Sequence, residues 1–281
     1  MNFIERKTSR YLFVCLAVGI LGGCIHFNSG SFNARTERTV ELEQPMASGG
    51  LFVANTEFGD VHISGEQTDR CRVTACISVQ AETEEQAVEI ANKIEVTLVP
   101  APHGIEVVIN KPEQNPRYSS GVELTVHLPF RVDVDARTSF GKVVLADIQG
   151  NAKIHTSFGN ISVERMTGPL KLNTSHGEIR CSEIQSGRLD LETSFGNITV
   201  SGLRSEEPLT AIANTSHGNI DFACPAEFGG QVEMSTSFGK IRTEKAITVK
   251  GDSSEEQLKG TIGSGPGSLT LRTSFGNINL N

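Results

Sequence analysis

The chain has 281 residues, of which 28 are glycine and two are tyrosine, and it contains no tryptophan. A low aromatic content with many glycines and β-branched residues is typical of strands and turns rather than helices. The formal net charge is −8, and no cluster of lysine and arginine appears beyond the first ten residues. Because nucleic-acid-binding proteins normally carry a basic face, we expect no nucleic-acid partner.

The N-terminus has the features of a bacterial export signal. Three basic residues within the first ten are followed by the apolar run 11–23, which is shorter than the roughly 20 apolar residues that span a bilayer. The run ends in Leu-Gly-Gly before Cys24, and this resembles the lipobox of bacterial lipoproteins. The resemblance implies cleavage of residues 1–23 and a lipid on Cys24 that attaches the protein to a membrane. The polar composition of 28–38 predicts a flexible tether, so that 24–38 comprise the lipidated cysteine and the tether. The alternative is an ordinary secretory signal with a chance cysteine.

Four further cysteines, Cys71, Cys76, Cys181 and Cys224, follow this segment. Cys71 and Cys76 are five residues apart, so within one strand they face opposite sides and should not pair. We expect the four to be mostly buried small apolar residues. The alternative is a disulfide, which an extracytoplasmic compartment would permit.

One pentapeptide, Thr-Ser-Phe-Gly-Asn, occupies residues 156–160, 193–197 and 273–277. Related copies are centred on the glycines Gly59, Gly141, Gly159, Gly177, Gly196, Gly218, Gly239 and Gly276. From Gly141 to Gly239 the steps are 18, 18, 19, 22 and 21 residues. The last step, from Gly239 to Gly276, is about twice as long, and we interpret the segment around Gly260 as a degraded copy in between.

Each position around the glycine keeps its chemical type. Threonine always stands three residues before it, valine or isoleucine always stands two residues after it, and a ring stands directly before it. From Gly141 onward the rings are Phe140, Phe158, His176, Phe195, His217, Phe238 and Phe275. Apolar residues at odd positions before glycine and even positions after it predict that the threonine, the ring and the valine or isoleucine all point inward. A buried phenylalanine or isoleucine would contribute about 1.5–3 kcal/mol.

The change from odd to even positions cannot occur within one regular strand. It predicts a bulge or corner at each glycine, where a residue without Cβ can adopt a positive φ. A unit of about 18–22 residues cannot bury its own apolar face, whereas stacked copies can. We therefore predict an all-β parallel β-solenoid over 137–281, with a right-handed winding from the crossover rule. The alternative is a meander of hairpins.

Residues 39–136 differ from the repeats, although they include the Gly59 copy. Alternating segments over 38–43, 49–63 and 70–81 predict strands, and three more are expected at 95–99, 105–110 and 122–128. A capping box begins at Thr83 and an apolar helical face follows it, so we expect one helix near 83–94. This β-rich module should cap the first coil of the solenoid. At the other end, the final coil at Asn281 is expected to present an unprotected edge through which copies could self-associate.

Together these features carry a resemblance to a known family. The export signal, the early turn at 59–65, the insert with a helix and the glycine-centred repeats ending at 273–280 resemble the putative-adhesin, toastrack-like β-strand-repeat family of bacterial envelope proteins. The resemblance covers roughly residues 38–281. It implies the fold, and it brings no shared catalytic residues or cofactor to this chain.

The sequence offers little support for catalysis or metal binding. No GxSxG, HExxH or Walker motif occurs, and Asp133 and Asp135 fall on a row that we expect to face solvent. The segment 263–268 is glycine-rich but lacks the lysine of a phosphate loop. His176 and His217 stand two coils apart, about 9.6 Å by the strand spacing, which is too far for one Zn²⁺. We expect no enzyme, no cofactor and no metal site.

Our leading hypothesis is a non-enzymatic, lipid-anchored envelope protein whose solenoid presents a surface for binding or adhesion. The partner would be an envelope glycan or protein, met by the polar row after the glycines, and the location would be extracytoplasmic, at the outer membrane or facing the periplasm. The alternative is a periplasmic scaffold or stress-sensing module. A weaker alternative is a carbohydrate-active β-helix enzyme.

Overall fold

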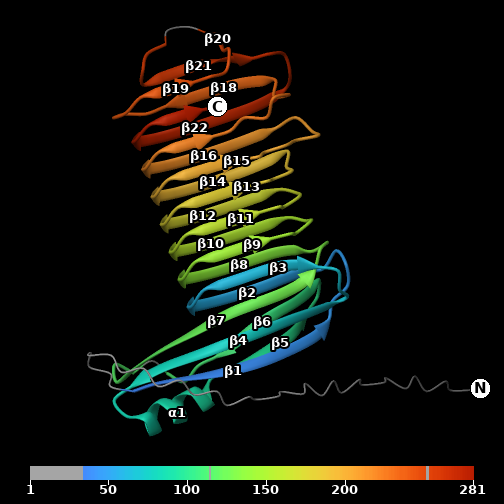
Figure 1. The fold of residues 1–281 in the computed structure, drawn as a ribbon, viewed down its shortest axis with the longest axis vertical. Helices are drawn as coiled ribbons and strands as arrows, with labels where there is room; N and C mark the ends of the chain where they lie inside the picture. Colours follow the sequence, from blue (N-terminus) through green and yellow to red (C-terminus); the bar gives the residue numbers. More distant parts are fainter. Residues whose placement is uncertain (1–33, 114, 251–252) are drawn as a thin grey trace, which may run out of the picture.

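The structure, a computed structural model, describes residues 34–113, 115–250 and 253–281. The expected signal segment and Cys24 lie outside the described residues, as does the expected tether up to residue 33. Residues 34–38, expected to belong to the tether, instead form the start of β1 (Ala34–Pro45). Within these ranges the chain forms two long sheets and one helix, α1 (Glu84–Lys93). Of the described residues, no helix is long and apolar enough to cross a membrane. The all-β solenoid predicted from the repeats is confirmed, and Figure 1 shows its coils stacked along the long axis.

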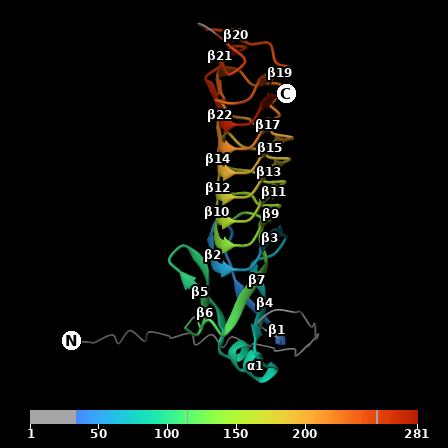
Figure 2. The same cartoon turned by 90° about the vertical axis from the view of Figure 1, so that its left-hand side faces the viewer.

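The strands fall into two sheets that face each other (Figure 2). In spatial order, the eleven-stranded sheet contains β1 (Ala34–Pro45), β4 (Arg70–Ala81), β7 (Tyr118–Pro129), β3 (Val61–Glu66), β9 (Val143–Ala146), β11 (Ile161–Glu164), β13 (Ile179–Ser182), β15 (Ile198–Ser201), β17 (Ile220–Phe222), β23 (Ile278–Leu280) and β19 (Ile241–Thr243). Named in the opposite direction along the stack, the twelve-stranded sheet contains β20 (Thr248–Val249), β21 (Gln257–Ile262), β18 (Gly230–Ser235), β22 (Gly267–Phe275), β16 (Thr210–His217), β14 (Arg188–Phe195), β12 (Leu170–His176), β10 (Ala152–Phe158), β8 (Asp133–Phe140), β2 (Leu51–Phe58), β6 (Gly104–Asn110) and β5 (Glu95–Ala101).

Each coil contributes one strand to each sheet, with the repeat glycine between them. In the coil of β10 and β11 the buried residues alternate at Ala152, Ile154 and Thr156, and then at Ile161 and Val163. These side chains fill the space between the sheets and form the core. Equivalent residues of successive coils pair in parallel and in register. The alternative of a hairpin meander is therefore wrong for the repeats.

The threonine column is buried because each hydroxyl has an acceptor in the neighbouring coil. Thr174 Oγ1 donates to the carbonyl of Gly159 at 3.0 Å, and Thr193 Oγ1 donates to that of Gly177 at 3.0 Å. A buried hydroxyl without a partner would be costly, whereas a satisfied one contributes about 1 kcal/mol. The same contact recurs at Thr138, Thr156, Thr215, Thr236 and Thr273.

The glycine column is required by close approach of the backbone. A Cβ on Gly177 would collide with the carbonyl oxygen of Gly159 in the neighbouring coil, and the same collision would occur at Gly196 against Gly177. The predicted positive φ is confirmed at five of the eight repeat glycines, where φ is 139–158°: Gly59, Gly141, Gly196, Gly218 and Gly276. It is absent at Gly159, Gly177 and Gly239. The close backbone contact is therefore the reason for glycine that all these coils share.

The ring column points outward, so the prediction that it faces the core is wrong. Phe140, Phe158, Phe195 and Phe275 are 45–48% exposed, and Phe238 is 67% exposed. The regular strand ladder is interrupted one residue before the ring. In-register pairs run from Thr156↔Thr174 directly to Phe158↔His176, skipping the serine between them. The alternation inferred from the threonine therefore does not extend to the ring.

The C-terminal coil is not the last coil in space. The strands β22 and β23 lie between the coil of β16 and β17 and the coil of β18 and β19 (Figure 1). The expected unprotected edge at Asn281 is therefore wrong, because β23 pairs with β17 on one side and β19 on the other. The segment around Gly260 is also no parallel copy, since β21 pairs antiparallel with β18. It belongs to the hairpin that covers the outer end of the twelve-stranded sheet.

The N-terminal module continues both sheets. Its strand β7 pairs with β3, and β6 pairs with β2. The Gly59 copy, remote in sequence, forms the first coil of the stack, since β2 pairs in register with β8. The boundary expected at 136–137 falls inside β8.

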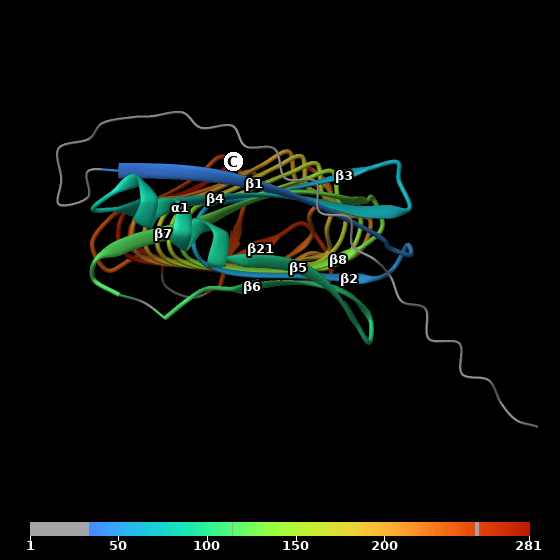
Figure 3. The ribbon, with the colours of Figure 1, turned by 90° about the horizontal axis from the view of Figure 1, so that it is seen from below.

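The single helix lies at the lower end of the molecule, against β1 and β4 (Figure 3). The side chain of Thr83 caps its start by accepting from the Gln86 amide at 3.3 Å. Ala87 and Ala91 are the buried residues of this helix. Arg38 of β1 donates to the carbonyls of Ala91 and Ile94, which satisfies acceptors at the helix end.

Candidate functional site

The outward rings form one continuous stack, which we call the aromatic ladder. In spatial order it contains Phe58, Phe140, Phe158, His176, Phe195, His217, Phe275 and Phe238. Neighbouring ring centroids are 4.6–4.9 Å apart and the ring planes differ by only 2–12°. Because both faces of each interior ring are covered by its neighbours, the surface exposes ring edges. The ladder is thus an apolar ridge along the side of the molecule.

The two histidines are members of this ladder. His176 lies between Phe158 and Phe195, with centroid distances of 4.6 and 4.9 Å. His217 lies between Phe195 and Phe275, with centroid distances of 4.7 Å on both sides. Phe195 separates the two imidazoles. Within the described ranges, no group of three or more histidine, cysteine, aspartate or glutamate side chains could hold a metal ion.

The polar row after the glycines is largely engaged within the stack. The side-chain oxygen of Asn197 accepts from the backbone amide of Asn219 at 2.8 Å, and that of Asn219 accepts from the amide of Asn277 at 2.8 Å. The side-chain oxygens of Asp60, Asn160 and Asn277 accept in the same way from a backbone amide of the neighbouring coil. These side chains satisfy backbone donors where the coil turns, so they are less available to a partner than the sequence suggested.

The carboxylates considered for catalysis are also engaged. Asp133 Oδ1 accepts from the amide of Asn151 at 2.7 Å. Asp135 accepts two hydrogen bonds from Arg137 at 3.0 and 3.1 Å. This pairing raises the pKa of Arg137 above its ordinary value. Neither carboxylate is arranged as a general acid or base with a second free carboxylate.

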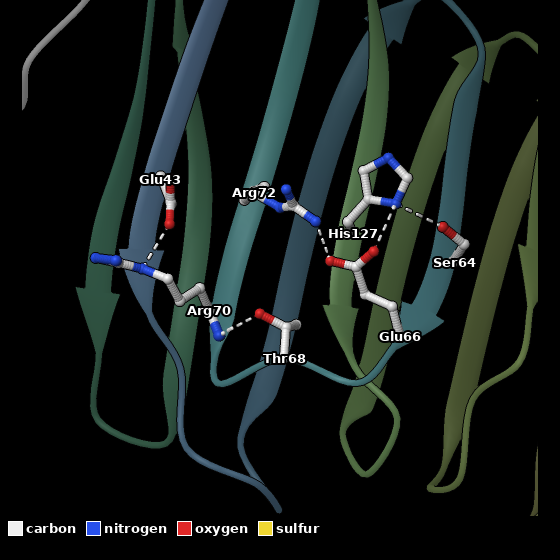
Figure 4. Close-up of polar contacts among 7 residues, drawn as sticks. All are labelled: Glu43, Ser64, Glu66, Thr68, Arg70, Arg72 and His127. Carbon is white, nitrogen blue, oxygen red and sulfur yellow. Dashed lines mark hydrogen bonds and ion pairs between the residues drawn. The ribbon is translucent and has the colours of Figure 1, made fainter.

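A polar cluster on the outer face of the eleven-stranded sheet was not predicted (Figure 4). His127 of β7 stands opposite Ser64 of β3 and Arg72 of β4 in the strand register. Its Nδ1 lies 3.0 Å from Ser64 Oγ and 3.8 Å from Glu66 Oε2, and Glu66 also pairs with Arg72. Only the pairing of distant strands brings these residues together, so no local sequence signal could have found them.

The cluster contains serine, histidine and glutamate but lacks the geometry of a catalytic triad. In a triad the serine contacts one ring nitrogen and the acid contacts the other. Here Ser64 and Glu66 both lie at Nδ1 of His127. The histidine therefore cannot take a proton from the serine while the acid orients its opposite side. We interpret the cluster as a solvent-facing network that links neighbouring strands.

The four cysteines are present as separate thiols. Cys71, Cys181 and Cys224 are buried, and Cys76 is half-buried. Burial raises the pKa of Cys71 and Cys181 to about 12. These thiols stay protonated near neutral pH and are poor nucleophiles, because the thiolate is the reactive form.

Comparison with known proteins supplies a family and a set of similar folds. The family model described as Toastrack DUF4097 matches residues 117–281. No curated protein is found to match the sequence. The structure resembles a putative adhesin from Bacteroides fragilis with a TM-score of 0.50 and 13% identity, covering 86% of this chain and 97% of that one.

Two further solved structures match with lower TM-scores. A putative cell adhesion protein from Clostridium sporogenes gives a TM-score of 0.40 and 13% identity, covering 85% of this chain and 97% of that one. A putative lipid binding protein from Parabacteroides distasonis gives 0.35 and 9%, covering 86% and 96%. At these identities the likeness concerns the fold and assigns no ligand.

Proposed function

Since the chain belongs to the Toastrack DUF4097 family, as the resemblance in its sequence indicated, we propose that it is a non-enzymatic, lipid-anchored protein of the bacterial envelope that binds an extended partner along its aromatic ladder. The residue types that argue for a binding role are the rings, whereas the carboxylates and the Ser64 cluster are engaged in internal pairs. The partner class is an envelope glycan or protein.

The observation that carries this proposal is the exposure of the ladder. Its phenylalanines are 37–67% exposed, and together with the two histidines they form one contiguous row. Soluble proteins rarely expose a contiguous apolar surface without a use for it. Eight rings at the strand spacing extend over roughly 34 Å, which suits a partner that lies along the row.

The orientation of the rings favours an oxygen-rich partner. Ring edges carry the positive end of the aromatic quadrupole, and the faces carry the negative end. Since the interior faces are covered by stacking, a partner meets the edges. Hydroxyl and carbonyl oxygens repeated along an extended chain would meet this edge favourably, and a glycan of the envelope has such a surface.

A histidine-substituted ladder tests this surface without breaking the stack. We expect the triple variant Phe140→His, Phe158→His and Phe195→His to unfold near the wild-type temperature, because histidine already stacks at 176 and 217. Its binding to purified peptidoglycan sacculi, measured by co-sedimentation, should weaken by about tenfold or more.

The matched control is Ile212→Thr, which removes an exposed apolar side chain from the outer face of the twelve-stranded sheet, away from the ladder. Threonine already occupies the equivalent position in the neighbouring coil, at Thr270. This variant should bind as the wild type does. Equal sedimentation of the triple variant and the wild type would show that the ladder is not the binding surface.

The lipid anchor and the location need a separate test in cells. We expect radiolabelled palmitate to be incorporated into the wild-type protein and not into Cys24→Ser. Protease added to intact cells should digest the solenoid if it faces outward, in agreement with adhesion. Protection until the outer barrier is opened would instead favour the periplasmic scaffold, and labelling of Cys24→Ser would contradict the lipobox.

A further inference from the structure

The aromatic ladder ends at Phe58 in a different way from its interior. Phe58 stacks on Phe140 at 4.9 Å, so one face of its ring is covered. The strand β6 pairs with β2 from Leu51↔Gly104 to Ala54↔Val107. Continuing this register places Lys111 at the position of the next ring, and Lys111 Nζ lies 5.9 Å from the Phe58 centroid. The ladder therefore ends on an ammonium group in place of a ring.

A hollow of about 410 Å³ opens at this end of the ladder. Its lining residues are Glu57, Phe58, Lys111, Pro112, Asn115, Pro116, Tyr118, Ser119 and Ser120. The volume lies within the range of small-molecule sites, which combine apolar walls with a few polar groups. Two prolines and two aromatic rings supply the apolar walls here.

The ammonium of Lys111 lacks a hydrogen-bond partner among the described residues, although its Nζ is buried. Burial lowers the pKa of Lys111, and the nearby Glu57 carboxylate opposes this effect. An ammonium carries three donors, and leaving them unmet in a buried position is costly. A bound molecule with hydroxyl oxygens near Nζ would supply the missing acceptors.

We propose that this hollow binds a neutral saccharide residue, whose C–H groups pack against the exposed part of the Phe58 ring and whose hydroxyls meet Lys111, Ser119 and Ser120. Sugar hydroxyls both donate and accept hydrogen bonds. The lining matches this, because lysine donates, glutamate accepts, and the serines and Asn115 do both. The charges of Lys111 and Glu57 cancel, which favours a neutral ligand over an acidic one. The site uses a hollow and the ammonium that ends the ladder, so it goes beyond the row of ring edges proposed above.

The opposite end of the ladder provides a control within the same molecule. Phe238 stacks on Phe275 at 4.9 Å and is 67% exposed, so it also has a ring face without a stacked neighbour. Of the described residues, no lysine or arginine is placed over its ring. A preference of the ligand for the Phe58 end would therefore show that the lysine and the hollow matter, beyond the exposed ring.

Tyr118 makes the site directly observable. It lines the hollow, and its hydroxyl donates to the carbonyl of Glu113 at 2.6 Å. The chain has two tyrosines and no tryptophan. In a full chain carrying Tyr11→Phe, the tyrosine fluorescence therefore comes from Tyr118 alone.

The test is a fluorescence titration of this protein with tetra-N-acetylchitotetraose and maltotetraose, and with a galacturonate tetramer as the acidic probe. We expect a saturable change with at least one neutral probe. Phe58→Leu and Lys111→Met should each weaken it by about tenfold or more, whereas Phe238→Leu should leave it unchanged. Lys111→Met retains the apolar stem, so it tests the ammonium even if Phe58→Leu perturbs folding.

Three results would overturn the proposal. They are the absence of any saturable response, saturation by the acidic probe alone, and a loss of affinity for the neutral probe in Phe238→Leu as large as that in Phe58→Leu. These results are distinguishable from failure of the proposed ladder function, because the triple histidine variant leaves all nine lining residues of the hollow unchanged.

Discussion

Replacing Gly177 with alanine is expected to destabilise the protein by about 3 kcal/mol or more. The added Cβ would collide with the carbonyl oxygen of Gly159, which is backbone and is itself fixed against Gly141 in the next coil. Neither side of the contact can move without separating two coils. Chemical denaturation of the variant and the wild type measures the loss.

Gly187→Ala is the matched control. A Cβ there would lie 3.3 Å from the Cβ of Glu207 and make no backbone contact, so a shift of a few tenths of an ångström would relieve it, whereas the Cβ at Gly177 would collide with a backbone carbonyl oxygen. It should change the free energy of unfolding by less than about 1 kcal/mol. Equal losses for the two variants would contradict close backbone approach as the reason for the glycine column.

The choice of Gly177 separates two explanations. Its φ lies outside the left-handed region, so alanine there would suffer from the contact and not from its backbone angle. Valine at Gly196 should also destabilise the protein strongly. Its Cβ would collide with the carbonyl of Gly177 in the neighbouring coil, and the positive φ of Gly196 adds strain, so this variant does not separate the two explanations.

Removing residues 267–281 is expected to unfold more than the strands that are deleted. The truncation removes β22 and β23, which are the parallel partners of the coil formed by β18 and β19. Hydrogen exchange should therefore show β18 to β21 unprotected while β10 to β14 remain protected, since these lie farther down the stack and keep both neighbours.

The outcome that would contradict this expectation is specific. If β18 remained protected in the truncated chain, it would have docked directly on β16, as the shared columns of the two copies would permit. The inserted coil would then be dispensable for the outer end. The full-length chain under the same conditions supplies the reference protection at each amide.

Much of the architecture could be predicted from the sequence because the repeat supplies several copies of each position, and the residue type at that position can be compared among them. The threonine and the valine or isoleucine columns predicted parallel stacking of coils, which the register of β10 with β12 confirms. The helix expected near 83–94 is α1, with Thr83 as its N-cap. These inferences depend on local alternation and capping, which a single sequence contains.

The order of the coils could not be predicted, for a physical reason. Copies that share the same columns are interchangeable as neighbours, so the pattern at Gly239 and the pattern at Gly276 each fit on the coil of Gly218. The chain between them forms the antiparallel strand β21, which allows the C-terminal copy to return beneath the outer one. Sequence order and spatial order then differ.

The candidate surface was found in the sequence, but its orientation was wrong. The column of rings was recognised, yet strand alternation carried past Thr156 placed Phe158 inside. The interruption of the strand ladder at the serine reverses the side on which the ring lies, and the amino-acid composition does not reveal it. The Lys111 hollow escaped notice because it depends on the register between β2 and β6, which are distant in sequence.

The junctions between interior coils are nearly identical, with one threonine-to-glycine hydrogen bond and one contact between glycines at each. A duplicated coil inserted between two others would recreate both junctions without altering either neighbour. The height of the stack can therefore change in evolution by whole layers of about 4.8 Å. Under the lipid anchoring proposed at Cys24, the number of such layers would set how far the outer end of the stack reaches from the membrane.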